Sequence, residues 1–128
     1  MTLLPSGAML GILGGEQLGR MSAMAAARLG YRCHIYAPGA DEPGMQVAAA
    51  RTVAAYEDHD ALARFAAQVD VVTFEFENVP AKTVEILARR VPCRPGEKAL
   101  AICQDRLQEK PFLEGIGVPV APWRAVRT

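Results

Sequence analysis

The sequence predicts an α/β fold built on a doubly wound parallel sheet, with helices on both faces of the sheet. Three observations support this prediction. Short apolar runs typical of buried strands alternate with helical segments of about ten residues. The first of these runs leads through a glycine turn directly into a helix. The chain has 128 residues, which suits one domain, because chains near this length bury roughly two-thirds of the surface that the unfolded form exposes.

The predicted elements begin with a strand, a glycine turn and a helix. Met9–Leu13 is apolar throughout, as expected of a strand buried on both faces. Gly30 is the expected C-cap of the helix that follows the turn. The helical spacing rests on Leu18, Met21, Ala25 and Leu29, and we interpret Met21 and Met24 as residues that pack this helix.

Four further strands and two helices are expected between Arg32 and Arg94. The best strand signal is Val71–Phe74, which is β-branched and aromatic. Asp58 is expected to cap the helix before this strand, and Pro80 suits the first turn of the helix after it. The other segments are a strand at Arg32–Tyr36, a loop at Pro38–Gly44, a weak strand at Thr52–Ala54, apolar helical stripes of Leu62, Phe65, Ala66 and Val69 and of Val84, Leu87 and Ala88, and a brief strand at Pro92–Arg94.

The last third of the chain differs from the rest. Glu97–Cys103 and Asp105–Leu113 have helical character, but Pro111 predicts a break near Lys110, because proline removes a hydrogen bond and clashes with the preceding turn. The chain from Gly115 to Trp123 is expected to be extended and is punctuated by proline. We therefore expect one domain over residues 1–118 and the start of a linker over residues 119–128, which would lead to a further domain absent from this chain.

Composition and charge argue against several function classes. The 14 basic and 14 acidic side chains give a formal net charge of zero, which argues against nucleic acid or an anionic membrane as partner. Met1–Gly15 is shorter than the ~20 residues of a membrane span and lacks a basic region, so we expect a cytoplasmic protein. Cys33, Cys93 and Cys103 match no metal-ligand spacing and are interpreted as reduced thiols. No nucleophile, base and acid form a catalytic set, and His34 and His59 are interpreted as structural or surface residues.

The glycine turn Gly14-Gly15-Glu16-Gln17-Leu18-Gly19 nearly matches the pattern G-x-G-x-x-G. A strand before it and a helix after it are the context in which main-chain N–H groups bind phosphate. Glu16 stands where the pattern has its middle glycine, and its carboxylate adds bulk and like charge at the point of closest approach. A phosphate site and a purely structural tight turn both remain open. A dinucleotide site is disfavoured, because Ile35–Ala37 offers no acidic residue for a ribose.

A second candidate site follows the strand at Val71–Phe74. Glu75 and Asn78 could face a ligand in the same crevice as the glycine turn, since ligands of open parallel sheets bind beyond the carboxyl ends of the strands. Alternatively, Glu77 or Asn78 caps the next helix, and for Glu77 we favour this structural role. For Glu75 both interpretations remain open. A third candidate group is Gln104-Asp105-Arg106 with Lys110. A structural role explains it equally well, with Asp105 as an N-cap and Arg106 as a solvent-exposed helical residue.

Three segments together resemble one family. They are GILGGEQLGRM at residues 11–21, VVTFEFENVP at residues 71–80 and AICQDRLQEK at residues 101–110. In this order they resemble the amino-terminal domain of the 5-(carboxyamino)imidazole ribonucleotide synthases, ATP-grasp enzymes of purine synthesis. The resemblance extends from about Ala8 to Trp123 and implies a Rossmann-like pre-ATP-grasp domain.

The resemblance implies a ligase reaction and assigns roles to residues. ATP, with Mg²⁺, would activate bicarbonate, and the amine of 5-aminoimidazole ribonucleotide would then be carboxylated. The turn at Gly15, Gln17 and Leu18 would meet the ribose phosphate, while Glu75 and Asn78 would hold another part of the ribonucleotide. Arg106 would contact ATP. Cytosolic homodimers are common in the family, so a homodimer is possible.

The chain departs from the family pattern in ways that affect function. The family has glycine at the position of Glu16, so the glutamate predicts a distorted phosphate cradle or a lowered affinity. Pro111 is unusual after Arg106 and could change how that arginine is presented. The ATP-grasp domains that carry phosphoryl transfer are missing, so we expect the 128-residue chain alone to be inactive. Two alternatives remain: the equivalent domain of a glycinamide ribonucleotide ATP-grasp enzyme, and a non-catalytic nucleotide-binding module of the same fold.

Overall fold

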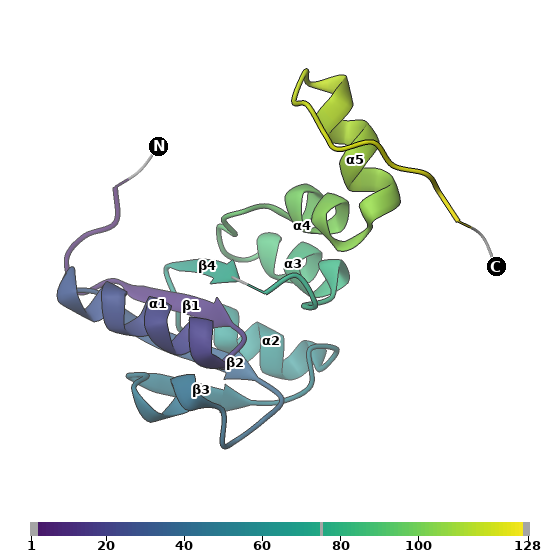
Figure 1. The fold of residues 1–128 in the computed structure, drawn as a ribbon. Coiled ribbons are helices and arrows are strands. Elements are labelled where there is room, and N and C mark those ends of the chain that lie inside the picture. The colour runs from purple at the N-terminus through teal and green to yellow at the C-terminus, as the bar shows by residue number, and fades with distance from the viewer. Residues whose placement is uncertain (1–2, 75, 127–128) are drawn as a thin grey trace.

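The computed structural model of the chain describes residues 3–74 and 76–126 and shows the predicted α/β fold (Figure 1). Strands and helices alternate through the first two-thirds of the chain, and two helices follow. The elements are β1 (Met9–Leu13), α1 (Gln17–Arg28), β2 (Arg32–Ala37), a 3-10 turn η1 (Pro43–Gln46), β3 (Ala50–Val53), α2 (His59–Ala66), β4 (Val71–Phe74), α3 (Ala81–Ala88), α4 (Glu97–Gln104) and α5 (Arg106–Gly115).

The four strands form one parallel sheet in the order β3-β2-β1-β4. Leu13, the last residue of β1, pairs with Tyr36 of β2 and with Phe74 of β4. Ala37 of β2 pairs with Val53, the last residue of β3. The carboxyl ends of all four strands therefore meet at one edge of the sheet, where the turns that follow them are brought together.

The brief strand predicted at Pro92–Arg94 is wrong. Only a single parallel bridge joins Cys93 to Val72 of β4 within the described residues. Prolines flank this short segment on both sides, at positions 92 and 95, and neither has an N–H to donate to a ladder. The segment therefore adds one pair of main-chain hydrogen bonds to the sheet but does not extend it.

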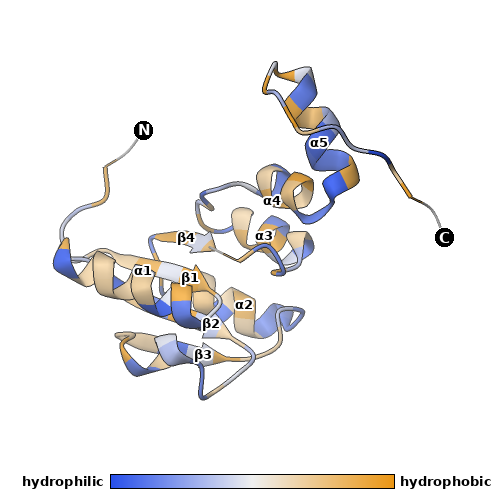
Figure 2. Ribbon diagram, viewed as in Figure 1, coloured by the Kyte–Doolittle hydropathy of each residue, from blue (hydrophilic) through white to orange (hydrophobic). Residues whose placement is uncertain are grey.

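The sheet separates two hydrophobic layers, as the prediction of a doubly wound fold requires. Side chains alternate along the strands, so that Ile12 and Ile35 pack on the α1 side while Leu13 and Tyr36 pack on the opposite side. The opposite layer is larger and includes residues of α2, α3 and α4. Figure 2 shows apolar residues concentrated on the sheet and on the inner helices. The predicted apolar stripe around Phe65 is confirmed. The predicted Asp58 cap is also confirmed, because its carboxylate accepts the Ala61 N–H at 2.9 Å.

Helix α1 buries a different face from the one expected. Met21 and Met24 are 55% and 43% exposed, so the interpretation of these residues as packing residues is wrong. The buried face is made of small residues, namely Gly19, Ala23 and Ala26. The helix lies so close to the preceding turn that a Cβ at Gly19 would come within 2.5 Å of the Gly14 carbonyl oxygen.

The termination predicted for α1 is confirmed. Gly30 has φ +82° and donates its N–H to the Ala27 carbonyl, and the Tyr31 N–H bonds the Ala26 carbonyl. These are the two hydrogen bonds of a Schellman motif.

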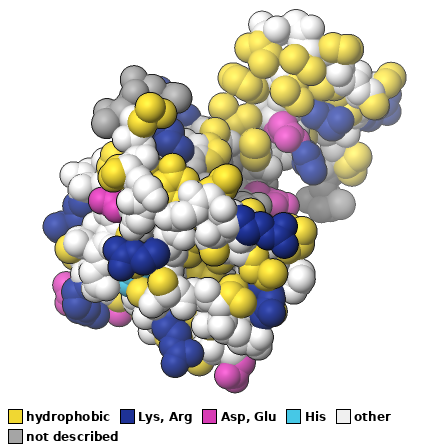
Figure 3. All heavy atoms as spheres, turned by 90° about the vertical axis from the view of Figure 1, so that its left-hand side faces the viewer, with side chains coloured by type: hydrophobic (Ala, Val, Ile, Leu, Met, Phe, Trp, Pro, Cys, Tyr) yellow, Lys and Arg dark blue, Asp and Glu magenta, His cyan; other side chains and the backbone are white. Residues whose placement is uncertain are grey.

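In the space-filling view of Figure 3, basic and acidic side chains on the visible face are interspersed with apolar ones.

The break predicted at Pro111 is wrong, because α5 runs through it from Arg106 to Gly115. Asp105 instead separates α4 from α5 and caps the second helix, accepting the Leu107 N–H at 2.8 Å. Pro111 has no N–H to donate to the Leu107 carbonyl, and α5 continues through it despite the cost of this lost hydrogen bond. Beyond α5 the chain has no regular structure as far as residue 126, as expected. No helix among the described residues is both long enough and apolar enough to cross a membrane.

Candidate functional site

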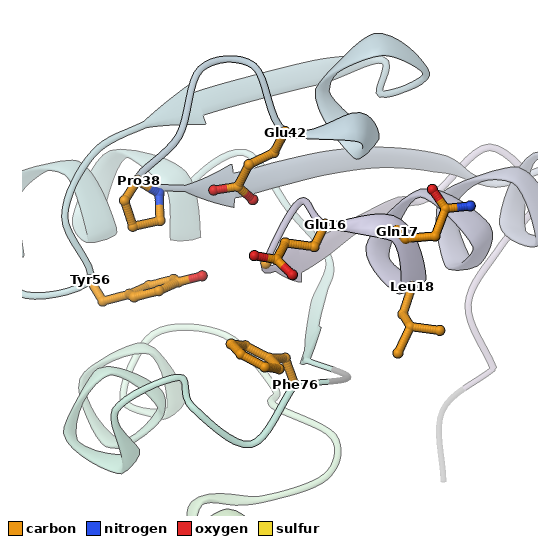
Figure 4. Close-up of a pocket in the computed structure, with 8 residues that line it drawn as sticks. Glu16, Gln17, Leu18, Pro38, Glu42, Tyr56 and Phe76 are labelled. Carbon is orange, nitrogen blue, oxygen red and sulfur yellow. The ribbon is translucent and has the colours of Figure 1, made fainter.

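A cavity of about 330 Å³ lies at the edge where the four strands end. Every strand contributes through the segment that follows it, and Figure 4 shows these side chains around a common space. The lining residues are Gly14, Glu16, Gln17 and Leu18 after β1, Pro38 and Glu42 after β2, Tyr56 after β3 and Phe76 after β4. The glycine turn and the segment after β4, which the sequence predicts to lie at one edge of the sheet, both contribute residues to this cavity.

The glycine turn after β1 shapes one wall of this cavity. Gly14 has φ +98°, a conformation that favours glycine, and it donates its N–H to the Tyr36 carbonyl at 3.0 Å. Glu16 has φ −70° and ψ −166°, which any residue adopts. The glutamate therefore does not strain the backbone. Glu16 would affect a bound anion only through its charge and its size.

The start of α1 presents main-chain donors to solvent. Glu16, at the N-cap position, makes no side-chain hydrogen bond to the helix. No described residue accepts the N–H groups of Gln17 and Leu18 in a main-chain or side-chain hydrogen bond. Free N–H groups at a helix start carry partial positive charge and attract anions. Gln17 and Leu18 thus lie at a helix start that can bind an anion, and the phosphate contact that the resemblance implies stays a prediction.

The N–H of Gly15 is already engaged. It donates to Oε2 of Glu42 at 2.8 Å, and Oε1 of the same carboxylate accepts the Gly39 N–H at 2.9 Å. The Gly44 N–H bonds the Gly15 carbonyl at 2.6 Å and ties the loop after β2 to the turn. Sequence reasoning missed Glu42, although its position in the loop after a parallel strand was a usable signal.

Tyr56 was also missed, and it contributes a polar group to the cavity. Burial, together with the nearby carboxylates of Glu42 and Glu16, raises the pKa of Tyr56 to about 12. Its hydroxyl therefore stays protonated at neutral pH and can donate a hydrogen bond. The ring stacks on Tyr36, with 6.0 Å between ring centroids, which anchors the side chain at this edge.

The segment after β4 places one expected residue outside the cavity. Asn78 lies in an exposed turn and is not among the residues that line the cavity. Glu75, the other expected residue, lies outside the described residues. Phe76 is the residue of this segment that faces the cavity.

The capping role favoured for Glu77 is wrong. Pro80 is the N-cap of α3, and no side chain caps this helix among the described residues. The carbonyls of Glu77 and Val79 instead accept hydrogen bonds from Nε2 of Gln104, each at 2.6 Å. Gln104, at the end of α4, therefore fastens the segment after β4 to the helical part of the chain.

Arg106 lies apart from the cavity. Its side chain is 75% exposed at the start of α5 and pairs with Glu109, which raises the pKa of the guanidinium. This geometry agrees with the alternative interpretation of Arg106 as a solvent-exposed helical residue without a binding role. The guanidinium lies at the surface, where a phosphate-bearing ligand could reach it, so the contact with ATP stays a prediction.

Among the described residues, the remaining titratable side chains form no second cluster. No three His, Cys, Asp or Glu side chains of residues 3–74 and 76–126 come together as a metal site. All three cysteines are free thiols, and only Cys103 is exposed. His34 is buried beside Thr52 and Phe65, which confirms its structural interpretation.

Comparisons with known proteins agree with this geometry. The family model of the ribonucleotide synthetase preATP-grasp domain matches residues 8–104. An N5-carboxyaminoimidazole ribonucleotide synthase of Brucella melitensis is 52% identical over 125 residues, which are 98% of this chain and 34% of that protein. The crystal structure of Staphylococcus aureus N5-carboxyaminoimidazole synthetase complexed with ADP superposes with a TM-score of 0.86 at 39% identity, covering 93% of this chain and 32% of that chain.

A more distant structure carries a ribonucleotide. The N5-carboxyaminoimidazole synthase of Aspergillus clavatus, in complex with ADP and 5-aminoimidazole ribonucleotide, superposes with a TM-score of 0.81 at 29% identity and covers 91% of this chain and 31% of that chain. The chain spans about a third of the length of the curated synthases from Brucella and Staphylococcus that it matches. Because the family model covers well over half of the chain, the chain belongs to the ribonucleotide synthetase preATP-grasp domain family.

Proposed function

We propose that this chain is the ribonucleotide-binding amino-terminal domain of an N5-carboxyaminoimidazole ribonucleotide synthase, an ATP-grasp ligase that carboxylates 5-aminoimidazole ribonucleotide in purine biosynthesis. The observation that carries the proposal is the cavity where the segments after all four strands meet beside the start of α1. The Aspergillus clavatus relative, whose complex contains 5-aminoimidazole ribonucleotide, supports a ribonucleotide as the ligand.

The proposal places the ribonucleotide across the mouth of this cavity. Its phosphate lies near the N–H groups of Gln17 and Leu18, where the helix start favours negative charge. Its ribose or aminoimidazole part lies toward the segment after β4, which carries Glu75 and Asn78. Arg106 is proposed to contact ATP, in keeping with the ADP and ATP complexes of relatives.

The reaction itself is proposed for the full-length protein. ATP and bicarbonate are its co-substrates, and a homodimer and a cytoplasmic location belong to the same proposal. The residues described here do not fit a resident Mg²⁺, because no three potential ligands come together among them. No metal-dependent step is therefore assigned to this chain, and the 128 residues alone are expected not to turn over ATP.

Titration of the ¹⁵N-labelled chain with 5-aminoimidazole ribonucleotide tests the proposal by NMR. We expect saturable shifts of the amides of Gln17, Leu18 and Phe76, because these line the proposed site. Gln17→Pro, at the first helical position where proline is tolerated, removes one of these N–H groups and should weaken binding by about threefold to tenfold, whereas Gln17→Ala keeps the N–H and should change binding less. Gln68→Ala, at an exposed position outside the cavity, is the matched control and should leave the affinity unchanged.

The same titration separates the alternatives. Equal shifts with glycinamide ribonucleotide would favour the domain of a glycinamide ribonucleotide enzyme, which has the same fold. Shifts with many unrelated nucleotides would favour a general nucleotide-binding module. Unmoved amides at Gln17, Leu18 and Phe76 at saturating ribonucleotide would contradict the proposed site.

A further inference from the structure

We propose that Glu42 is a specificity-determining residue of the cavity. Its carboxylate occupies the main-chain donors of the glycine turn and the following loop that would otherwise attract a phosphate. The floor of the cavity is thereby reserved for ligand groups that donate hydrogen bonds, such as hydroxyl or amino groups. This inference rests on the proposed function for the identity of the ligand, whereas the exclusion of phosphate from Gly15 can be tested without it.

The first argument is the geometry of the carboxylate. Oε2 accepts the Gly15 N–H at 2.8 Å and Oε1 accepts the Gly39 N–H at 2.9 Å, so each oxygen takes one main-chain donor. A bound phosphate or sulfate would accept hydrogen bonds from two such N–H groups in the same way, through two of its oxygens. The protein's own side chain thus fills the position at Gly15 in place of an external anion.

The second argument is the need for glycine at both donors. Neither Gly15 nor Gly39 has a positive φ, so backbone conformation does not require glycine there. A Cβ at Gly15 would lie 2.8 Å from Oε2 of Glu42, and a Cβ at Gly39 would lie 2.8 Å from Oε1. A side chain at either position would displace the carboxylate. Glu42 therefore explains glycine at position 39 and, together with Ile35, whose Cγ2 would lie 3.1 Å from a Cβ at Gly15, glycine at position 15.

The third argument is the charge of the cavity. Glu16 and Glu42 direct their carboxylates into the same space, facing the Tyr56 hydroxyl, as Figure 4 shows. Burial raises the pKa of Tyr56, and the two carboxylates add to this because they lie close to its hydroxyl. A phosphate, with about −1.5 to −2 charges near pH 7, would be repelled from this floor. Hydroxyl and amino groups would find two carboxylates as acceptors.

The test uses inorganic phosphate and the ¹⁵N-labelled chain, followed by NMR. In the unaltered chain we expect the Gly15 and Gly39 amides to stay in place as phosphate is added. In Glu42→Ala both amides should shift saturably, with phosphate bound at least about tenfold more tightly, because two donors are released and a like charge is removed. Glu42→Gln, which keeps the size but loses the charge, should give a smaller gain.

Glu16→Gln is the matched control, because it removes the same charge from the same cavity without releasing the Gly15 N–H. It should tighten phosphate by at most a few-fold and leave the Gly15 amide in place. The phosphate-free nucleoside 5-aminoimidazole riboside gives the opposite readout, since Glu42→Ala should weaken its binding several-fold.

Three results would overturn the inference. One is a phosphate-induced shift of Gly15 in the unaltered chain equal to that in Glu42→Ala. Another is a Glu42→Ala chain with native amide dispersion whose Gly15 does not respond to phosphate. The third is an equal gain in phosphate affinity and an equal Gly15 shift in Glu42→Ala and Glu16→Gln, because Glu42 would then act only through its charge. Failure of 5-aminoimidazole ribonucleotide to bind would contradict the proposed function, but the phosphate titration would still decide the role of Glu42.

Discussion

At the scale of single residues, the three glycines of the turn serve three different needs. Gly14 supplies a positive φ, Gly15 leaves room for the Glu42 carboxylate, and Gly19 lets α1 approach the turn. The roles of Gly14 and Gly19 correspond to the tight turn and the close helix packing of the G-x-G-x-x-G pattern, whereas the role of Gly15 does not. The middle position of that pattern, Glu16, has an ordinary backbone conformation and requires no glycine here.

Gly19→Ala should destabilise the fold by about 1–3 kcal/mol. The added methyl group would lie 2.5 Å from the Gly14 carbonyl oxygen, and this backbone atom cannot move away without shifting the turn. Urea unfolding measures the loss. Gly115→Ala is the control, because a methyl group added there would meet no other atom within 4 Å, and the free energy of unfolding should change by less than ~0.5 kcal/mol. Equal stability of Gly19→Ala and the unaltered chain would contradict the close packing of α1.

At the scale of elements, the side chain of Gln104 hydrogen-bonds α4 to the segment after β4. Gln104 donates to two carbonyls of that segment, and Phe76 in the same segment lines both the candidate cavity and a second cavity of about 270 Å³ beside α4. The position of the Phe76 ring therefore depends on how firmly Gln104 holds the segment.

Gln104→Ala should loosen this segment and lower the free energy of unfolding by about 1 kcal/mol, because the carbonyls of Glu77 and Val79 lose their donor. Hydrogen exchange of the Val79 and Thr83 amides should become faster. Gln68→Ala, at an exposed position away from this segment, should change neither quantity. Unchanged exchange in Gln104→Ala would show that the segment is held by its other contacts.

The sequence predicted elements better than contacts between them. The strand at Val71–Phe74 was placed correctly, because its β-branched and aromatic residues leave little choice. The third strand lies two residues earlier than expected at its start, since Ala50 and Arg51 have no strand preference and are held by pairing with β2. The contacts of Glu42 with Gly15 and of Gln104 with Glu77 could not be predicted from local patterns, because each joins residues 27 positions apart along the chain.

At the scale of the whole molecule, a buried histidine links stability to pH. His34 is 2% exposed, and its Nδ1 has no hydrogen-bond partner among the described residues. Its neighbours are uncharged: Thr52 bonds Nε2 at 2.8 Å, and Phe65 packs edge-on against the ring. Burial lowers the pKa of His34 below its ordinary value, because a charged imidazolium cannot be solvated there.

Stability should therefore fall on mild acidification. The unfolded chain binds a proton on His34 near pH 6.5, whereas the folded chain resists it. The stabilisation is fully present above about pH 6.5 and is lost as the pH falls through the lowered pKa of the folded state. Urea midpoints measured between about pH 7 and pH 5 should decline in the unaltered chain and less steeply in His34→Gln. His59→Gln, at an exposed position, should keep the original decline, and an equal flattening in both variants would contradict the role of His34.

The contact between Glu42 and the two glycines also restricts the order in which this sequence can change. A side chain introduced at Gly15 or Gly39 would collide with the carboxylate while Glu42 is present. Loss of Glu42 removes that obstacle at position 39, whereas a Cβ at position 15 would still lie 3.1 Å from Cγ2 of Ile35. An evolutionary path away from the present arrangement would therefore pass first through position 42, and the three positions would drift as a set.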